Sequence, residues 1–432
     1  MDGDFTVKSC ALITEYNPFH NGHYYHILKA KKITNSESAI AVMNGNFTQR
    51  GVPAIIDKWA RTEQALKSGV DLVIELPLLY GLRSAEFFAS AAVNLITETG
   101  LIDSIVFGSE TGNIDILKDL AYVFNNENKI YKKKMKKYLN QGLNYPTARN
   151  KTLIECRKLY TNINKYSESE IKYAVSNPNN ILGIEYLKAV QRNNMDINVR
   201  TIKRKGPDYH SSLIEGKFAS ASLIRKIVRE NNIKKSSEKI KNLMPASSLN
   251  ILKRELTKGR FIPDNQLLIR QIIEKIRRLS PEKLREYPEI ANGLENRIFT
   301  SALNTGDLTK FLKQINAKNY THTRIMRSLL YIWLNIKKKD FKTINKYNPP
   351  YIRILGLRKG KENLLKKIKT NSALPLIINP SEILRSPDFE TNNPVKLTLS
   401  FEIMADDLYS LLRKSASERK AREDYHKKLI KI

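Results

Sequence analysis

The segment that decides the fold is Cys10-Ala11-Leu12-Ile13-Thr14-Glu15-Tyr16-Asn17-Pro18-Phe19-His20-Asn21-Gly22-His23. Residues 10–14 form a short apolar run, which predicts a buried β-strand. Pro18 cannot donate a ladder hydrogen bond, so the strand ends before it. Residues 22–32 are amphipathic and predict a helix that begins at the two histidines. A strand that turns directly into a helix is the first half of a βα unit, so the segment predicts an α/β fold with a parallel sheet.

The same segment predicts a phosphate site. The first turn of a helix offers free N–H groups and the positive end of the dipole, and Gly22 leaves the backbone accessible. His20 and His23 lie three residues apart, on the same side of that turn, where they can donate hydrogen bonds to phosphoryl oxygens. The alternatives are a metal site, for which no third ligand has a suitable spacing, and ordinary surface histidines. Three of the six histidines fall within residues 20–26, which argues against chance.

The alternation of apolar runs and amphipathic stretches continues beyond this segment. Further strands are predicted at 39–43, 71–76, 104–108 and 197–202, and further helices at 58–68, 85–97 and from Ser220. Residues 120–175 are mostly polar and lysine-rich, which predicts a helical excursion. After about residue 230 the pattern is mainly helical and basic, with short strands expected near 375–378 and 396–400. We therefore predict an α/β domain over 1–235 and a mainly helical, basic domain over 236–432.

The charge is unevenly distributed. The chain of 432 residues has a formal net charge of +31. Its first 120 residues hold 10 Lys and Arg against 14 Asp and Glu, so the remaining 312 residues carry a net +35. Such an excess indicates a polyanionic partner, most simply RNA. A general drift of surfaces towards lysine is the alternative, but drift would not spare the first 120 residues.

Several classes of protein are excluded. No apolar run approaches the roughly 18 residues of a membrane span, and no membrane partner is expected. The two cysteines, Cys10 and Cys156, have no metal-ligand spacing and fit a reducing, cytoplasmic setting. The chain lacks the glycine-rich loop of P-loop proteins, the Gly-x-Gly-x-x-Gly of dinucleotide oxidoreductases, and a recognisable catalytic triad.

Other polar segments are candidates for the same nucleotide site. Gly108 follows the fourth predicted strand, where a doubly wound sheet binds its ligand. Ser220 and Ser222 begin a helix that also carries Arg225, an arrangement suited to terminal phosphates, although serine is also an ordinary helix cap. The pocket edges are expected at 177–180 and at Lys203-Arg204. The loop 44–51, with Asn46 and Gln49, is placed to hold a small second substrate.

Cationic clusters in the second half are candidates for RNA contacts. Arg324 and Arg327 lie on one face of a predicted helix, and Arg353 lies in a segment that mixes cations with Tyr351. Arginines interleaved with aromatic residues suit RNA phosphates and unstacked bases. Each cluster taken singly also fits a solvated surface, so the prediction of RNA binding depends on their sum.

The motifs together resemble a known family. A strand and turn leading into His-x-Gly-His, followed later by Ser-x-Ser-x-x-Arg, resemble the Rossmann-like, HUP-type nucleotidyltransferases. Segments along nearly the whole chain are similar to the bacterial tRNA(Met) cytidine acetate ligases: 15–23, 45–51, 54–61, 71–77, 84–95, 107–110, 179–185, 220–225, 294–298, 321–327 and 351–356. Two positions depart from the expected pattern: Asn44, where a serine is expected, and Ser211, where an acidic residue is expected.

This resemblance implies a tRNA-processing ligase. ATP and acetate would give acetyl-adenylate and pyrophosphate, and the acetyl group would pass to the wobble cytidine of elongator tRNA(Met), giving N(4)-acetylcytidine. Mg²⁺ would accompany the phosphates, without a dedicated protein cage. His20 and His23 would be catalytic, Asn46 and Gln49 would face the small substrate, and Arg324, Arg327 and Arg353 would contact the tRNA. The expected ATP-binding residues are Ile13, Thr14, Glu15, Tyr16, Asn17, Pro18, Phe19, His20, Asn21, Gly22, His23, His26, Gly108, Asn180, Lys203, Arg204, Ser220, Ser222 and Arg225.

Two other functions stay open from the residues alone. The N-terminal motif also fits an adenylyltransferase that makes a small nucleotide cofactor, and such an enzyme would not need the basic half. A non-catalytic RNA-binding protein that senses ATP would show salt-sensitive tRNA binding, because phosphate contacts release counterions, and would form no AMP.

Overall fold

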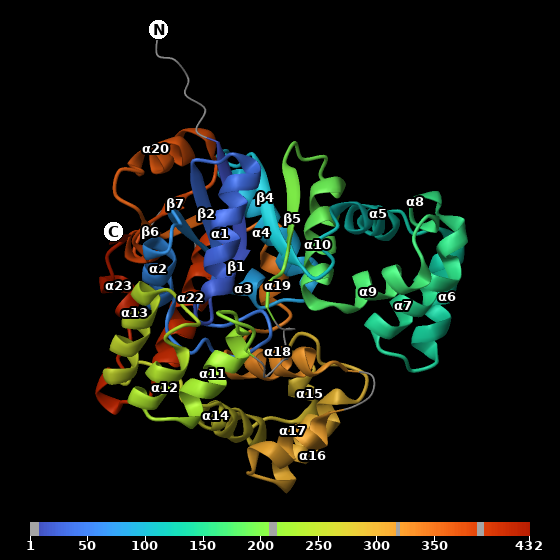
Figure 1. The fold of residues 1–432 in the computed structure, drawn as a ribbon. Coiled ribbons are helices and arrows are strands. Elements are labelled where there is room, and N and C mark those ends of the chain that lie inside the picture. Colours follow the sequence, from blue (N-terminus) through green and yellow to red (C-terminus); the bar gives the residue numbers. More distant parts are fainter. Residues whose placement is uncertain (1–7, 207–213, 317–319, 387–392) are drawn as a thin grey trace.

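The computed structural model describes residues 8–206, 214–316, 320–386 and 393–432, and within them the strands form a single sheet (Figure 1). The strand order is β5-β4-β1-β2-β3-β6-β7, and β8 pairs with β6. Strands β1 to β5 are parallel to their neighbours, whereas β6 runs antiparallel to β3. The strands are β1 (Ser9–Thr14), β2 (Ser38–Asn44), β3 (Leu72–Leu76), β4 (Ser104–Ser109), β5 (Asn198–Lys203), β6 (Ile352–Leu357), β7 (Leu376–Ile377) and β8 (Ile430–Lys431).

The predicted βα units are confirmed, and the helices that follow the first strands lie on both faces of the sheet. In the first 230 residues the helices are α1 (Asn21–Thr34), α2 (Lys58–Lys67), α3 (Leu78–Gly81), α4 (Ala85–Glu98), α5 (Ile114–Asn125), α6 (Lys129–Asn140), α7 (Tyr145–Cys156), α8 (Thr161–Asn164), α9 (Glu168–Ser176), α10 (Pro178–Arg192) and α11 (Ala221–Glu230). Side chains of β1 alternate between two cores. Cys10 and Leu12 pack with α1 and α2, and Ala11 packs with α4 and α10 on the other face. This double covering is why the strands read as continuous apolar runs.

The strand order indicates where a ligand site is expected in this sheet. β1 lies between β4 on one side and β2 on the other, so the chain reverses its direction across the sheet at β1. In doubly wound sheets the crevice for a ligand lies outside the carboxyl ends of the strands at this switch point. The His20–His23 segment follows β1 at this edge, and Gly108 and Lys203 lie at the carboxyl ends of β4 and β5.

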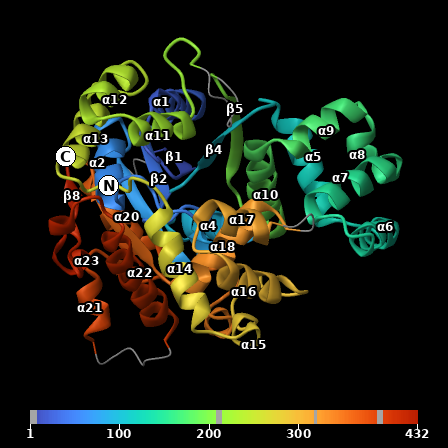
Figure 2. The same cartoon turned by 90° about the horizontal axis from the view of Figure 1, so that it is seen from below.

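The lysine-rich excursion is helical, as predicted. It consists of α5 to α9 with a short 3₁₀ helix at Arg157–Leu159, and it projects to one side of the sheet beyond α10 (Figures 1 and 2). α10 packs against α4, α5, α9 and β4, and thereby connects the excursion to the sheet.

The second half is mainly helical but returns to the sheet. Its helices are α12 (Ile233–Ile240), α13 (Ala246–Thr257), α14 (Gln266–Arg277), α15 (Pro281–Leu284), α16 (Leu294–Asn304), α17 (Leu308–Ile315), α18 (His322–Trp333), α19 (Asp340–Thr343), α20 (Glu362–Asn371), α21 (Pro380–Leu384), α22 (Pro394–Leu411) and α23 (Glu423–His426), with a 3₁₀ helix at Ala416–Glu418. Because β6, β7 and β8 complete the sheet, the two halves share a core. The division near residue 235 stays a prediction about separate domains.

In two segments the structure differs from the prediction made from the sequence. Residues 396–400, expected as a strand, lie inside α22, because their apolar side chains belong to a longer helix that packs on α3. Residues 352–357, expected as a cationic surface segment, form the fully buried strand β6. Among the residues that the structure describes, no helix is both long enough and apolar enough to cross a membrane.

Candidate active site

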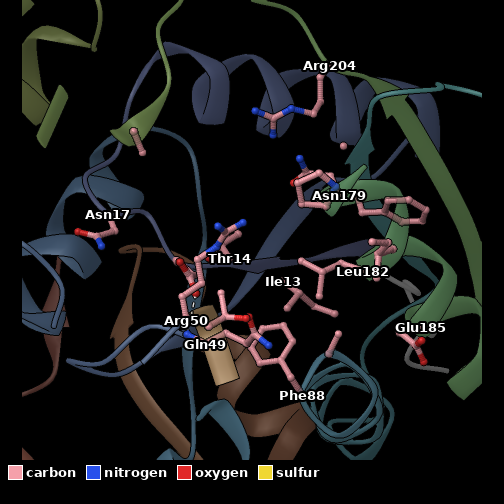
Figure 3. A pocket seen from close by; sticks show the side chains of 18 of the residues that line it. Ile13, Thr14, Asn17, Gln49, Arg50, Phe88, Asn179, Leu182, Glu185 and Arg204 are labelled. Atoms are coloured by element: carbon pink, nitrogen blue, oxygen red, sulfur yellow. Dashed lines mark hydrogen bonds between the residues drawn. The ribbon is translucent and has the colours of Figure 1, made fainter. Parts of the chain in front are cut away.

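The candidate active site is a cavity of about 930 Å³ at the carboxyl ends of β1, β4 and β5. Ile13, Thr14, Gly108 and Lys203 line it from the strand ends, at the switch point of the sheet. Figure 3 shows Arg204 at one end of the cavity and Phe88 at the other. A cavity of this size and place fits a nucleotide together with a second substrate.

The two histidines of the motif are locked by the start of α1. His20 is the N-cap residue, and its Nδ1 accepts a hydrogen bond from the N–H of Gly22 at 3.0 Å. The Nδ1 of His23 accepts in turn from the N–H of His20 at 3.3 Å. This is a capping box built from imidazoles, in which each ring uses Nδ1 as an acceptor. The ring proton therefore sits on Nε2 in both histidines, and each Nε2–H is a donor for a ligand.

Both rings are neutral at physiological pH. Burial, with smaller effects from the charges of Arg204 and Arg225, lowers the pKa of His20 to about 3. Burial also holds the pKa of His23 well below its usual value, with smaller effects from His20 and Arg204. Burial, and then Arg204, lower the pKa of His26 to about 4. The cavity thus presents uncharged imidazole donors beside permanently charged guanidinium groups.

The start of α11 meets the start of α1 at the same cavity. Ser220 is the N-cap of α11, and its Oγ accepts from the N–H of Leu223 at 3.1 Å. Arg225 donates from Nη1 to the carbonyl of Asn17 at 2.6 Å and from Nη2 to the Oγ of Ser222 at 3.1 Å. Ser220 is therefore a helix cap, which was one of the two interpretations of the sequence. It also lines the cavity, together with Arg225. Two helix N-termini and a cation at one site favour an anionic ligand.

A loop on the other side of the cavity is fixed by an asparagine. Asn180 is fully buried, and its Oδ1 accepts from the N–H groups of Glu110 at 2.9 Å and Thr111 at 3.2 Å. It supports the loop after β4 and is not among the residues that line the cavity. Its neighbour Asn179 lines the cavity instead, and donates to the carboxylate of Glu110 at 2.6 Å.

Of the two residues predicted to face the small substrate, one lines the cavity and the other does not. Gln49 lines the cavity, where its N–H donates to Glu15 Oε1 at 2.9 Å and its Nε2 donates to the carbonyl of Arg83 at 2.8 Å. Asn46 is buried outside the cavity, because its Oδ1 accepts from the N–H of Lys58 and its Nδ2 donates to Asp406. The loop 44–51 therefore reaches the cavity through its second half.

Of the three arginines predicted to bind RNA, two line the cavity and one is fully buried. Arg324 and Arg327 line the cavity, and both are held by Glu289: the first through the backbone carbonyl at 2.9 Å, the second through the carboxylate at 2.8 Å. Arg353 is fully buried in β6. A guanidinium without exposed surface has no access to RNA, so its interpretation as a tRNA contact is corrected.

Arg353 belongs to a buried ion network. Its guanidinium lies 3.1 Å from Glu75, 3.1 Å from Glu402 and 2.8 Å from Asp424. Lys58 reaches Glu75 at 3.0 Å and Asp424 at 2.8 Å. The network joins α2 and β3 of the first half to β6, α22 and α23 of the second.

Most of the predicted site residues meet at the cavity. Those that line it are Ile13, Thr14, Glu15, Tyr16, Asn17, His20, Gly22, His23, His26, Gln49, Gly108, Lys203, Arg204, Ser220, Arg225, Arg324 and Arg327. Those that do not are Pro18, Phe19, Asn21, Asn46, Asn180, Ser222 and Arg353. Asn21 lies beside the site, and its Nδ2 ties α1 to the segment before α11 through the carbonyl of Lys217 and to the second half through the carbonyl of Asn242.

Sequence reasoning missed several residues of the site. Phe88, Tyr145, Arg149 and Glu185 line the cavity and come from α4, α7 and α10. Phe88 and Glu185 lie in the segments 84–95 and 179–185 that resemble the family, but their place in the site depends on the excursion folding back against α10. The buried Arg61 was also missed; it donates to the carbonyl of Glu15 at 2.7 Å and of Asn44 at 3.1 Å, and so fixes the ends of β1 and β2.

The unexpected Asn44 is buried, and its Nδ2 lies 3.4 Å from the carbonyls of Phe47 and Gly81. Ser211 lies outside the described residues. Over the described ranges, no group of three His, Cys, Asp or Glu side chains is placed to hold a metal ion.

The fold and the site define a class of protein. The family model described as "HIGH Nucleotidyl Transferase" matches residues 7–424. Two relatives named tRNA(Met) cytidine acetate ligase come from Halothermothrix orenii and Acetivibrio thermocellus. The first is 47% identical over 420 residues (97% of this chain, 98% of the relative) and the second 40% identical over 426 (98% and 100%). The chain belongs to the tRNA(Met) cytidine acetate ligase family.

Solved structures agree with this assignment. The crystal structure of Thermotoga maritima TmcAL bound with alpha-thio ATP has a TM-score of 0.87 and 31% identity, and the match covers 98% of this chain and 99% of that one. The apo form of the same protein has a TM-score of 0.89, with the same identity and coverage. The similarity extends over both halves, including the strands that the second half adds to the sheet.

Proposed function

We propose that this protein uses ATP to activate acetate as acetyl-adenylate and then acetylates the wobble cytidine of elongator tRNA(Met), giving N(4)-acetylcytidine, AMP and pyrophosphate. The proposal is supported by the names of relatives that match the chain along nearly its full length. It is also supported by the ATP analogue bound to the similar Thermotoga maritima protein. ATP, acetate and tRNA are the proposed substrates, and the cytoplasm is the proposed location.

The observation that carries the proposal is the pair of neutral imidazoles at the start of α1. In the first step an acetate oxygen attacks the α-phosphorus of ATP, and the bond from that phosphorus to the departing pyrophosphate breaks. Negative charge on the phosphoryl oxygens is stabilised by the Nε2–H donors of His20 and His23. Arg225 and the N–H groups at the start of α11 hold the pyrophosphate. Preorganised donors of this kind act mainly through electrostatics and positioning.

In the second step the N4 amine of the cytidine attacks the carbonyl carbon of acetyl-adenylate. A C–N bond forms, the C–O bond to AMP breaks with its electrons going to the phosphate, and the amine proton passes to solvent or to the released phosphate. The mixed anhydride is reactive enough to need only an oriented amine. Arg324 and Arg327, at the cavity wall, are the proposed contacts to the arriving RNA.

Mg²⁺ is proposed only as a companion of the ATP phosphates. Within the described residues no set of three carboxylate, imidazole or thiolate groups forms a cage for it. This fits the preference of Mg²⁺ for phosphate oxygens and water over all-protein sites. Bound there, it would neutralise phosphate charge.

The test is ATP–pyrophosphate exchange with acetate, and without tRNA. We expect exchange that depends on acetate and is lost in His23→Ala. A companion reaction contains ATP, labelled acetate and tRNA, and mass analysis of the nucleosides should find labelled N(4)-acetylcytidine. If other small acids support exchange and acetate does not, the proposed reaction is wrong.

A further inference from the structure

One aromatic side chain stands at the rim of the active-site cavity. Tyr145 lines the cavity and is 56% exposed, the largest exposed fraction among the large hydrophobic side chains that the structure describes. It is the first residue of α7, and it comes from the helical excursion rather than from the sheet. An aromatic ring that faces both solvent and a substrate cavity is placed to stack on a ligand entering from outside.

The start of α7 is held firmly against the sheet domain. Arg149, one turn further along α7, is 93% buried (7% exposed), and its guanidinium lies 3.5 Å from the carboxylate of Glu185 on α10. Lys188 binds the other oxygen of Glu185 at 2.7 Å. The same guanidinium lies 4.8 Å from the centre of the Phe124 ring. These contacts fix the position of Tyr145 relative to the catalytic end of the cavity.

A cationic surface leads to this rim. α6 carries six lysines among its 12 residues and no acidic residue. Lys132, Lys133, Lys136 and Lys137 are exposed. α6 packs against α7, and only residues 141–144 separate the two helices, so the lysine-rich last turns of α6 approach the start of α7.

A second aromatic ring and cation lie near the cavity, in the second half of the chain. Arg324 lines the cavity from α18, and its guanidinium lies 4.7 Å from the centre of the Tyr320 ring. This pair adds a second cation and aromatic ring near the cavity, and of the two, Arg324 lines it. Stacking rings combined with cations are the means by which proteins hold splayed-out bases and the backbone of single-stranded RNA.

We propose that the surface formed by α6 and the start of α7, here called the excursion surface, is a docking site for the tRNA loop that delivers the target base. Its exposed lysines bind the phosphates, and Tyr145 stacks on a base at the rim. This inference rests on the proposed function for the identity of the RNA. It places an RNA contact in the first half of the chain, in addition to the basic second half.

Charge favours RNA over a second copy of this chain as the occupant. A second copy would bring its own lysines against the same lysines, and like charges across an interface oppose association. A polyanion removes this repulsion and releases counterions.

The test measures binding of an unmodified elongator tRNA(Met) transcript by fluorescence anisotropy at several salt concentrations, without ATP. We expect Tyr145→Ala to raise the dissociation constant about 5- to 150-fold, the range for one lost stacked base, and Tyr145→Phe to bind like the unaltered protein. Lys133→Gln/Lys137→Gln should weaken binding and flatten its salt dependence by about 1.4 units of log–log slope, roughly 0.7 for each lost contact to a single strand.

The matched control is Lys366→Gln/Lys369→Gln. These two exposed lysines lie on α20, on the other side of the molecule from the excursion (Figures 1 and 2). This double variant should change the dissociation constant for the tRNA by less than about twofold. Both lysine pairs should keep acetate-dependent exchange, and thermal unfolding should confirm that all variants are folded.

Three results would overturn the inference. The first is an unchanged dissociation constant for the tRNA in Tyr145→Ala. The second is an equal loss of tRNA affinity in the double lysine variants of α20 and of α6. The third is a changed oligomeric state of the α6 variant while its tRNA affinity is unaltered. The proposed function is tested separately. If it is wrong, the unaltered protein shows no acetate-dependent exchange, and the comparison of RNA binding among the variants can still be interpreted.

Discussion

The imidazole rings of His20 and His23 are stacked, with ring centres 3.8 Å apart and planes inclined by 29°. Two protonated rings could not lie this close in a buried site, because the charges would repel and neither would be solvated. The stacking therefore excludes protonation of both rings at once, and the lowered pKa values of the two residues indicate that each is neutral. The relationship makes the start of α1 a pair of aligned, uncharged donors.

Replacing the proposed catalytic donors, His20 and His23, should separate their effect on catalysis from their effect on folding. His23→Gln keeps a side-chain oxygen at the N3 position, where glutamine completes a capping box, and His20→Asn keeps a good N-cap. We expect each variant to stay folded and to lose acetate-dependent exchange about 10²- to 10³-fold, the effect of removing one preorganised donor. Exchange rates with circular dichroism test this, and near-normal exchange in both variants would refute the assignment.

The buried histidines should make stability depend on pH in the acid range. The pKa of His20 is about 3 in the folded protein and about 6.5 in the unfolded chain. Between these values the unfolded chain binds more protons, so the free energy of unfolding falls as the pH falls through this window. From pH 7.5 to 5.5 the loss is about 1.4 kcal/mol for each such histidine.

Urea unfolding of the unaltered protein and of His20→Asn at these two pH values isolates the contribution of one ring. The variant should lose less stability on acidification, by about 1.4 kcal/mol. Equal losses in the two proteins would mean that His20 takes up its proton as readily in the folded state as in the unfolded chain.

Gly22 should be needed for the position of His20. A Cβ at this position would lie 2.8 Å from Cε1 of His20, so the ring would have to move from its cap. We expect Gly22→Ala to destabilise the protein by about 1 to 3 kcal/mol and to lower acetate-dependent exchange. Gly306→Ala is the control, because a Cβ there meets nothing within 4 Å and should be neutral or slightly stabilising.

Arg353 should act through stability and not through RNA. Arg353→Met leaves Glu402 without its ion-pair partner and leaves Lys58 to offset both Glu75 and Asp424, and we expect a loss of about 3 to 5 kcal/mol in the free energy of unfolding. Arg358→Met removes a partly exposed arginine, whose partner Asp71 keeps Lys31 at 2.6 Å, and should cost at most about 1 kcal/mol. Weaker tRNA binding in folded Arg353→Met, with stability unchanged, would contradict the buried assignment.

The sequence predicted the features that depend on neighbours along the chain. The strands of the first half are buried on both faces, so each reads as a short apolar run. The histidine motif could be recognised because a strand end, a turn and a helix start are adjacent in sequence, and all three histidines of 20–26 line the cavity. Local hydrogen bonding and periodicity are sufficient for such features.

The failures share one cause. Arg353 looked like a surface cation because an isolated strand cannot bury a charge, yet Glu75, Glu402 and Asp424 surround it in the folded chain. Asn46 and Asn180 lie in polar loops near the site, but hydrogen bonds to more distant segments turn them away from the cavity.

The amino-acid sequence alone thus determined the βα order, the turn that leads from β1 into α1 with its histidines, and the excess of positive charge in the later part of the chain. The tertiary structure decided which polar side chains face the cavity, that β6 joins β3, and that Tyr145 reaches the rim. The physical reason is that burial of a charge or exposure of a ring depends on partners from other segments, and only the folded chain brings those partners together.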